Sequence, residues 1–443
     1  MARRQQPRTG REKPDTVAFG ARLTIERLGQ RGEGIARFRG ASVFVPHALP
    51  GEDVLADISG DRASVTEVLK PSPERIEPVC PHYGTCGGCA IQVLQPDSYF
   101  RWKQSLVADA LAREKIAAPV QDILRAHGDG RRRITFHARI NHDSPAGVRI
   151  ALGFMRARSH DIVDIEACPV LCPDLANAAE AGRRIARTMS ALGKPLDIVI
   201  TATETGLDVD MRGAGSLPDP MRLALSRLAE DLGLARIANH GDIILERDTP
   251  VLRIGSAMLA PPPGAFLQAT AAGEEALSAL VLNAATGAKR IADLFAGLGT
   301  FALRLAAIAP VHAVENDEAA LHALARAAGG ASGLKGVTTE SRDLFRRPLM
   351  AAELQPFDCI VFDPPRAGAL EQARQLAQST VPVVVGVSCN AQTFARDAAI
   401  LIDGGYVMEN VTPVDQFLYS PHVEMVGIFR KQAAKKPRRR LLG

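Results

Sequence analysis

The sequence predicts an α/β protein of several domains: a small β-barrel first, a central α+β domain next, and a seven-stranded sheet with helices last. Three observations support this order. Short strand-like runs separated by turns fill residues 18–72, strands and helices alternate through 73–258, and a stricter strand–helix alternation runs through 259–431. The segments 1–17 and 432–443 are basic and lack hydrophobic periodicity. We therefore expect residues 1–17 to be a disordered basic tail and residues 432–443 to be a second basic tail.

Composition is that of an ordinary globular protein. The chain has 443 residues, 46% of them hydrophobic, and no apolar run reaches the roughly 18 residues of a membrane span. No apolar stretch follows the basic N-terminus as it would in a secretory signal, so we expect a cytoplasmic monomer without membrane contact. Residues 1–14 and 430–443 hold 12 of the 53 Lys and Arg residues, which is typical either of nucleic-acid contacts or of solubilising segments.

The predicted barrel contains four clear strands. They cover residues 23–25, 41–45, 54–58 and 63–69, and a glycine-bearing turn at 29–34 separates the first from the rest. Several short strands in about 50 residues are typical of a small barrel of the OB type, often a platform for nucleic acid. A purely structural barrel has the same pattern.

A cysteine cluster follows the barrel. Cys80, Cys86 and Cys89 fall within ten residues, and the interspersed glycines allow the backbone to fold tightly around a centre. An odd total of seven cysteines without a secretion signal favours metal binding or catalysis over disulfides. Cys168 is the best candidate for a fourth ligand, with Cys172 close behind. Four thiolates suit zinc or an iron–sulfur cluster, and the residues alone leave both open.

Three arginines at 131–133 open a predicted strand of the central domain. Basic and aromatic residues interleave along this strand, which fits contacts to an RNA backbone and its bases. A charge run on a solvated surface is the ordinary alternative. The segment therefore indicates an RNA contact without establishing one.

The C-terminal sheet contains a cofactor pattern. A strand at 291–295 runs into the loop of Gly297, and Glu315 ends the next strand 18 residues later. In this arrangement the glycine lets a nucleoside cofactor approach the backbone, and the acid bonds ribose hydroxyls. The loop is shorter than the dinucleotide fingerprint and the surroundings are acidic, which indicates the cationic donor S-adenosylmethionine. Asp343 and Asp363 end two further strands.

Another thiol lies at the end of a buried strand. The valine-rich run 383–387 ends abruptly at Ser388, Cys389 and Asn390. Open α/β sheets have their ligand crevice at the carboxyl ends of the strands, so Cys389 is a candidate nucleophile. A buried structural cysteine is the alternative.

These motifs, in this order, resemble the RNA uracil-carbon-5 methyltransferases, in the subgroup that acts on 23S rRNA. The resemblance covers residues 18–431 and implies a TRAM-type barrel, a central domain with a [4Fe–4S] cluster, and a class I, Rossmann-like methyltransferase domain. It rests on the cysteine cluster, Asp293–Gly297, Asp363–Arg366, Ser388–Asn390 and His422–Glu424. Thr270, Thr300 and the segment 419–421 depart from residues that are usual in the family.

The resemblance also implies roles for single residues. The implied cluster ligands are Cys80, Cys86, Cys89 and Cys168. The implied methyl-donor contacts are Gln268, Phe295, Glu315, Asp343 and Asp363, beside Gly297 in the loop. Cys389 is the implied nucleophile and Glu424 the implied base. A uridine of the tRNA T-loop is an alternative substrate, and a non-catalytic iron–sulfur RNA-binding protein is an alternative of another class.

The residue types suit this chemistry. Carbon 5 of uracil becomes nucleophilic only after a thiolate has added to carbon 6, and cysteine is the side chain that is partly ionised near neutral pH. A carboxylate must later remove the carbon-5 proton, and Glu424 stands at the start of an apolar segment where burial raises the pKa of an acid. The uridine must lie in a loop or be flipped out, because a base inside a duplex is out of reach.

Overall fold

The computed structural model describes residues 17–141 and 148–432, so nearly all of both predicted basic tails lies outside the described residues. The chain divides into two compact units. Unit 1 comprises the described residues up to Gly84 together with Gly88–Trp102 and Tyr419–Pro421, and unit 2 comprises the rest.

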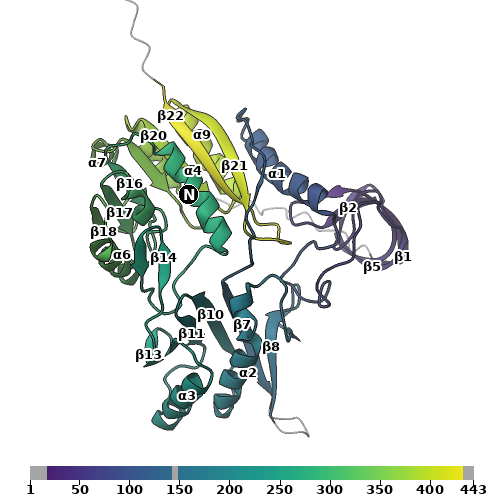
Figure 1. Cartoon of the computed structure of the whole chain (residues 1–443). Helices are drawn as coiled ribbons and strands as arrows, with labels where there is room; N and C mark the ends of the chain where they lie inside the picture. Colours follow the sequence, from purple (N-terminus) through teal and green to yellow (C-terminus); the bar gives the residue numbers. More distant parts are fainter. Residues whose placement is uncertain (1–16, 142–147, 433–443) are drawn as a thin grey trace, which may run out of the picture. The chain divides into compact units, whose positions relative to one another are not determined.

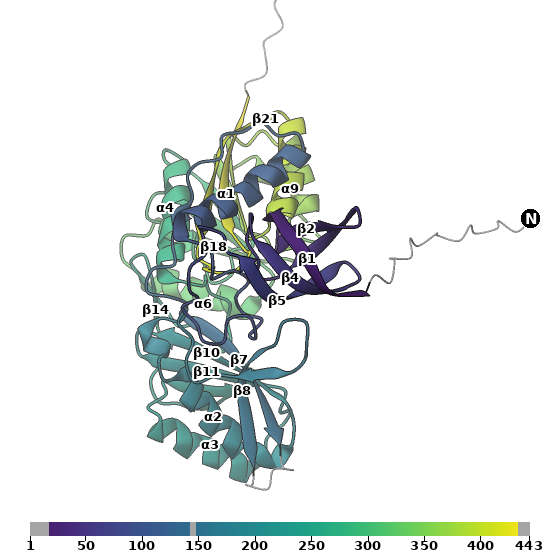
Figure 2. The ribbon, with the colours of Figure 1, turned by 90° about the vertical axis from the view of Figure 1, so that its right-hand side faces the viewer.

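A closed five-stranded barrel forms most of unit 1, in the strand order β1-β2-β3-β5-β4 (Figure 2). Residues alternate between inside and outside along β4, and the inward side chains of Val54 and Ile58 are fully buried. The prediction of a small N-terminal barrel is therefore confirmed. The strands are β1 (Val17–Leu28), β2 (Gly34–Phe38), β3 (Ala41–Val45), β4 (Asp53–Ser59) and β5 (Arg62–Lys70).

A seven-stranded, largely antiparallel sheet forms the first part of unit 2, in the order β13-β12-β11-β10-β7-β8-β9. Helices α2 (Ala178–Thr188) and α3 (Asp219–Asp231) pack on it through a core that includes Phe136, Ile185 and Leu225 (Figure 1). This part also contains two short 3₁₀ helices (Pro173–Leu175 and Ser190–Leu192) and a separate hairpin of β14 (Leu252–Ile254) and β15 (Ala257–Leu259). The strands of the sheet are β7 (Arg133–Asn141), β8 (Arg149–Met155), β9 (Ile162–Asp164), β10 (Leu196–Thr203), β11 (Gly206–Arg212), β12 (Arg236–Asn239) and β13 (Asp242–Glu246).

The second sheet of unit 2 has the order β18-β17-β16-β19-β20-β22-β21-β6. It therefore has eight strands where the sequence predicted seven. The additional strand, β6 (Leu124–Arg125), precedes the central sheet in the chain and pairs with β21 through Val414 and Leu124. The other strands are β16 (Ile291–Leu294), β17 (Val311–Glu315), β18 (Val337–Ser341), β19 (Cys359–Phe362), β20 (Val383–Ser388), β21 (Tyr406–Asp415) and β22 (Glu424–Lys431).

Helices cover both faces of this sheet, as in a doubly wound α/β fold (Figure 1). Successive strand residues point to opposite faces: Val385 lies in the core beneath α4, whereas Val384 lies in the core shared with α9. Within the described residues, no helix is both long and apolar enough to cross a membrane. The helices are α4 (Ala271–Ala284), α5 (Ala302–Leu305) and α6 (Glu318–Gly330) on one face, and α7 (Ala351–Leu354), α8 (Leu370–Gln378), α9 (Ala391–Asp403) and the second half of α1 (Pro96–Arg113) on the other.

Strand register brings the predicted site residues to one edge of the sheet. Leu294 pairs in parallel with both Val314 and Phe362, so the residues that follow these three leave the sheet at the same level. Those following residues are Phe295, Glu315 and Asp363, from segments far apart in the chain. Parallel strands thus gather three of the predicted donor contacts.

Candidate active site

The loop after β16 leaves open space beside its backbone. Phe295 and Gly297 have positive φ angles of 61° and 53°, which turn the chain sharply at the end of the strand. A Cβ atom at Gly297 would meet no heavy atom of the described residues within 4 Å. At Gly299, by contrast, a Cβ would lie 2.3 Å from Leu324 Cδ1. The first glycine therefore offers room for a ligand, and the second allows close packing of the loop on α6.

Backbone amides hold the acid at the end of β17. The N–H of Gly297 donates to Glu315 Oε2 at 3.0 Å, and the N–H groups of Asn316 and Asp317 donate to Oε1 at 2.7 and 3.0 Å. The carboxylate is thus fixed without a cationic side chain among these bonds. An acid held in this way is ready to accept hydrogen bonds from ribose hydroxyls on its remaining lone pairs.

Asp343 lies beyond β18, where Oδ1 accepts the N–H of Phe345 at 3.0 Å. The ring of Phe345 is 47% exposed and lies 5.4 Å from the ring of Phe295, centroid to centroid. Two aromatic side chains and an acid at the end of neighbouring strands form a surface suited to a purine ring.

Buried carboxyl groups concentrate negative charge behind this loop. Burial raises the pKa of Asp363 to about 7, and Gln268 Nε2 donates to Asp363 Oδ2 at 3.4 Å. Asp293, in the middle of the site's first strand, is completely buried. Burial, and next the charge of Asp363, raise the pKa of Asp293 well above its usual range. A site with this charge distribution favours a cationic ligand over a neutral one.

Cys389 follows β20 directly and precedes α9. The side-chain oxygen of Asn390 accepts the N–H groups of Gln392 and Thr393 at 2.9 and 3.3 Å, which caps the helix and turns the chain after the thiol. Burial raises the pKa of Cys389 to about 11, and the charges of Glu424 and Asp363 act in the same direction. In this ligand-free state the group is a thiol at neutral pH.

Antiparallel pairing brings Glu424 and that thiol to the same end of the sheet. Strand β20 pairs with β22 as far as Ser388 opposite Met425, so Cys389, the next residue of one strand, and Glu424, the residue before Met425, lie where this pairing ends. The charge of Glu424 acts on the thiol. Glu424 is 4% exposed, and burial, followed by the charge of Asp363, raises its pKa to about 8. Cys389, Glu424 and Asp363 thus bring a thiol and two carboxyl groups with raised pKa values to one end of the sheet.

The predicted metal ligands are divided between the units. Cys80 and Cys89 belong to unit 1, whereas Cys86 and Cys168 belong to unit 2, where both pack against the core of the central sheet. Gly87 donates its N–H to Met155 O at 2.9 Å, and a Cβ at Gly87 would lie 2.8 Å from that oxygen, so only glycine fits next to Cys86. Among the described residues, no group of three or more His, Cys, Asp or Glu side chains is placed as a metal site.

The arginines at 131–133 have different environments. The guanidinium of Arg132 makes its contacts within the protein: it forms an ion pair with Glu274, and its Nε donates to Gln268 O at 3.2 Å. Its contact with RNA therefore stays a prediction. Arg131 and Arg133 line a cavity of about 260 Å³, and their Nε atoms are buried without a hydrogen-bond partner among the described residues.

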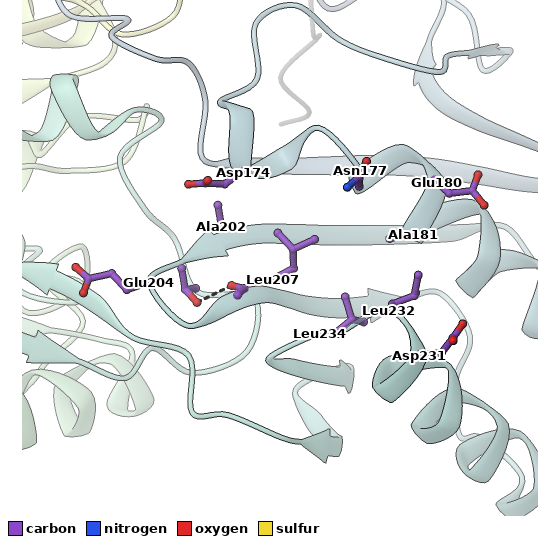
Figure 3. A pocket seen from close by; sticks show the side chains of 13 residues that line it. Asp174, Asn177, Glu180, Ala181, Ala202, Glu204, Leu207, Asp231, Leu232 and Leu234 are labelled. Carbon is purple, nitrogen blue, oxygen red and sulfur yellow. Dashed lines mark hydrogen bonds between the residues drawn. The ribbon is translucent and has the colours of Figure 1, made fainter.

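A second hollow, of about 680 Å³, lies between α2, α3 and the β10–β11 hairpin (Figure 3). Four carboxyl side chains surround it, which would repel a phosphate backbone. None of the predicted site residues lines it, so we assign it no part in the candidate site. The acidic residues are Asp174, Glu180, Glu204 and Asp231.

Sequence reasoning missed two buried residues beside the site. Gln416 is 0% exposed and donates to both Gln268 and Glu424, at 2.7 and 3.3 Å. Lys103, also completely buried, pairs with Asp415 at 2.8 Å. Neither belongs to a motif, and a buried lysine in a helix of polar pattern gives no local signal of its role.

Comparison with known proteins agrees with this geometry. Residues 256–433 match the family model of the tRNA (uracil-5-)-methyltransferases, and residues 21–63 match the TRAM domain. The chain is 46% identical to an RNA methyltransferase of Mesorhizobium japonicum, over 95% of this chain and 100% of the relative. It is 33% identical to the 23S rRNA (uracil(1939)-C(5))-methyltransferase RlmD of Chromohalobacter salexigens, over 96% and 94%.

A solved structure has the same fold. The tRNA (uracil-54, C5)-methyltransferase of Pyrococcus abyssi, in complex with S-adenosyl-L-homocysteine, superposes with a TM-score of 0.70. The alignment covers 92% of this chain and 100% of the other, at 23% sequence identity.

The raised pKa of Cys389 predicts slow alkylation in the absence of ligands. With a pKa of about 11, the thiolate fraction, and with it the alkylation rate by iodoacetamide, should rise about tenfold per pH unit between about pH 7 and pH 10. Mass spectrometry of the peptide that contains Cys389 separates this thiol from the other six. A rate that levels off below about pH 9 would contradict the burial of the thiol among carboxyl groups.

Proposed function

The chain belongs to the RNA uracil-C5 methyltransferase family, and from this membership we propose that it methylates carbon 5 of a uridine in 23S rRNA with Cys389 as the nucleophile. It is an S-adenosylmethionine-dependent RNA methyltransferase, as its relatives are, so the non-catalytic alternative is not retained. The observation that supports the proposed mechanism is that the β20–β22 pairing ends at Ser388 and Met425, next to Cys389 and Glu424, and that the charges of Glu424 and Asp363 both act on the thiol.

The proposed reaction begins at Cys389. The thiolate adds to carbon 6 of the uracil, and the electrons of the carbon 5–carbon 6 double bond move onto the carbon-4 carbonyl as an enolate. The bound donor supplies an electrophilic methyl group on its sulfonium. Carbon 5 attacks that methyl, and the carbon–sulfur bond of the donor breaks to leave the neutral thioether.

Glu424 completes the cycle as the base. Its carboxylate takes the proton from carbon 5, the freed electrons restore the double bond, and the carbon 6–sulfur bond breaks to release the Cys389 thiolate. Both groups have raised pKa values in the ligand-free protein. A cation bound beside Asp363 lowers both pKa values, since it stabilises the thiolate and the carboxylate together.

The donor contacts are proposed from the same edge of the sheet. Glu315 would bind the ribose, Phe295 and Asp343 would flank the purine, and the carboxylate of Asp363 with Gln268 would face the cationic end. Gly297 would lie against the donor, because its position offers open space. Phe295, Glu315 and Asp363 are proposed from their places at the carboxyl ends of β16, β17 and β19. Asp343 lies two residues beyond β18, and Gln268 lies in the loop before α4 and donates to Asp363.

Arg131 and Arg133 support binding of an RNA backbone. Their unpartnered Nε atoms border a cavity, and burial together with Arg212 lowers the pKa of Arg133, as expected where positive charge is crowded. A phosphate placed there would relieve that repulsion. The TRAM-type barrel is a further candidate RNA surface.

The steps assigned to Cys389 and Glu424 predict that substitutions of these residues change the amount of covalent RNA adduct in opposite directions. Cys389→Ala should abolish both methyl transfer and the covalent RNA adduct, whereas Glu424→Gln should retain methyl transfer and accumulate the methylated adduct. Cys359→Ala is the matched control, because Cys359 is a buried thiol of the same sheet and lies in its core. Radiolabelled methyl transfer and denaturing gels measure these outcomes; full turnover in Cys389→Ala would refute the mechanism.

The RNA class is tested by mapping. The chain matches the 23S rRNA methyltransferase RlmD over nearly the whole length of that enzyme, which favours ribosomal RNA as the substrate. It shares its fold with the tRNA methyltransferase of Pyrococcus abyssi, so the T-loop uridine of tRNA is the second candidate. We expect 5-methyluridine in 23S rRNA to disappear from cells that lack the gene, with tRNA unchanged. Loss from tRNA alone would assign the second substrate.

We also propose that Cys80, Cys86, Cys89 and Cys168 hold a [4Fe–4S] cluster. The donor set is four thiolates, Cys86 and Cys168 lie at the same core, and Cys172 is buried within that core. The cluster would supply a rigid crosslink between distant segments, which contributes to folding. Four cysteine side chains are also a common ligand set for zinc.

The cluster proposal predicts a brown protein. Visible absorbance should be lost in Cys86→Ser and Cys168→Ser, and retained in Cys172→Ser, the matched control for the fourth ligand. Absorbance spectra and iron analysis of protein purified without oxygen measure this. A colourless wild-type protein with one zinc per chain would overturn the assignment.

A further inference from the structure

Gln416 occupies a fixed position directly after β21. The preceding residue, Asp415, pairs with Lys103 Nζ at 2.8 Å and accepts the N–H of Phe417 at 3.1 Å. Lys103 Nζ also donates to Phe417 O at 3.4 Å and to His422 O. One buried ammonium group therefore holds the chain on both sides of Gln416 and just ahead of Glu424.

The amide of Gln416 has one possible orientation. Its Oε1 faces the N–H of Thr270 at 3.4 Å, and a backbone N–H can only donate, so the acceptor oxygen must be on this side. Nε2 then points the other way. It donates to Gln268 Oε1 at 2.7 Å and to Glu424 Oε1 at 3.3 Å.

Packing prevents this amide from swinging away. Thr270 caps α4 through a hydrogen bond of 2.9 Å from Gly273 N to its Oγ1. A Cβ at Gly273 would lie 2.6 Å from both Cβ and Oε1 of Gln416. Because only glycine fits there, the first turn of α4 presses directly on the buried amide.

The resulting chain of hydrogen bonds joins the two ends of the proposed reaction. Asp363 accepts from Gln268, Gln268 accepts from Gln416, and Gln416 donates to Glu424. The donation favours the ionised form of Glu424, and it is the first of the interactions that lower the pKa of this acid against its burial. It also ties up Oε1, which leaves Oε2 as the oxygen to receive a proton.

We propose that Gln416 is a positioning residue that orients Glu424 for the elimination step and couples it to donor binding at Gln268 and Asp363. This inference rests on the proposed function. The reaction it concerns is the transfer of the carbon-5 proton to Glu424 Oε2 as the carbon 6–sulfur bond breaks. Gln416 itself exchanges no proton with the substrate.

Gln416→Met tests the proposal, because methionine has a similar volume and donates no hydrogen bond. Elimination should slow about tenfold, the typical effect of one lost hydrogen bond to a charged group. Methyl transfer in a single turnover should change much less, so the methylated covalent adduct accumulates. The apparent pKa of the base in the pH profile of turnover should rise, since the carboxylate loses its donor.

Gln372→Met is the matched control. Gln372 is 1% exposed, and its amide makes two hydrogen bonds, both with the backbone of Leu349 and none with a residue of the candidate site. If loss of packing alone caused the effect, Gln416→Met and Gln372→Met would behave alike: neither would accumulate the adduct, and neither would shift the pH profile of turnover. If Gln416→Met fails to fold, Gln416→Glu replaces it, with a carboxylate beside Glu424 that should raise the apparent pKa further.

Different results would contradict the proposed function and the positioning role of Gln416. If wild-type protein forms no methylated adduct with any RNA, the proposed function is wrong. If wild type turns over and the Gln416 variant has a wild-type adduct fraction and pH profile, or slows both steps equally, the positioning role of Gln416 is wrong.

Discussion

The pairing of β20 with β22 is the constraint on which the candidate site depends. Strand β22 runs antiparallel between β20 and β21, and the register places Ser388 opposite Met425. A slip of one residue would turn every side chain of β22 to the other face. The alternation of Met425 and Val426 between the two cores prevents such a slip, because both faces are buried. Core packing thus determines which carboxyl group lies beside Cys389.

The acids and the thiol of the site resist ionisation until something positive binds. Asp293, Asp363 and Glu424 all have raised pKa values because burial disfavours their ionised forms. The same burial keeps Cys389 protonated in the ligand-free protein. In the proposed mechanism, a cationic donor therefore does more than deliver a methyl group: its charge would make both the thiolate of Cys389 and the carboxylate of Glu424 accessible near neutral pH. This favours donor binding before attack on the uracil.

Local sequence patterns predicted the parts of the site that strand ends determine. Glu315, Asp363 and Cys389 each follow a short apolar strand, and parallel strands bring such ends together whatever the intervening helices contain. Long-range packing was not predictable in this way. The short β6 has no strand pattern of its own, and the ion pair of Arg132 with Glu274, 142 residues away, has no local signature either.

The buried pair of Lys103 and Asp415 is better explained by geometry than by stability. Removing an ammonium and a carboxylate from water costs several kcal/mol each, and their attraction offsets this only with good additional hydrogen bonds. Here those bonds go to the carbonyl groups of Phe417 and His422 and to the N–H of Phe417, all in the segment that leads to Glu424. An apolar pair would fill the same space but could not orient these backbone groups. The polar pair is therefore retained where the chain must present Gln416 and Glu424 at fixed positions.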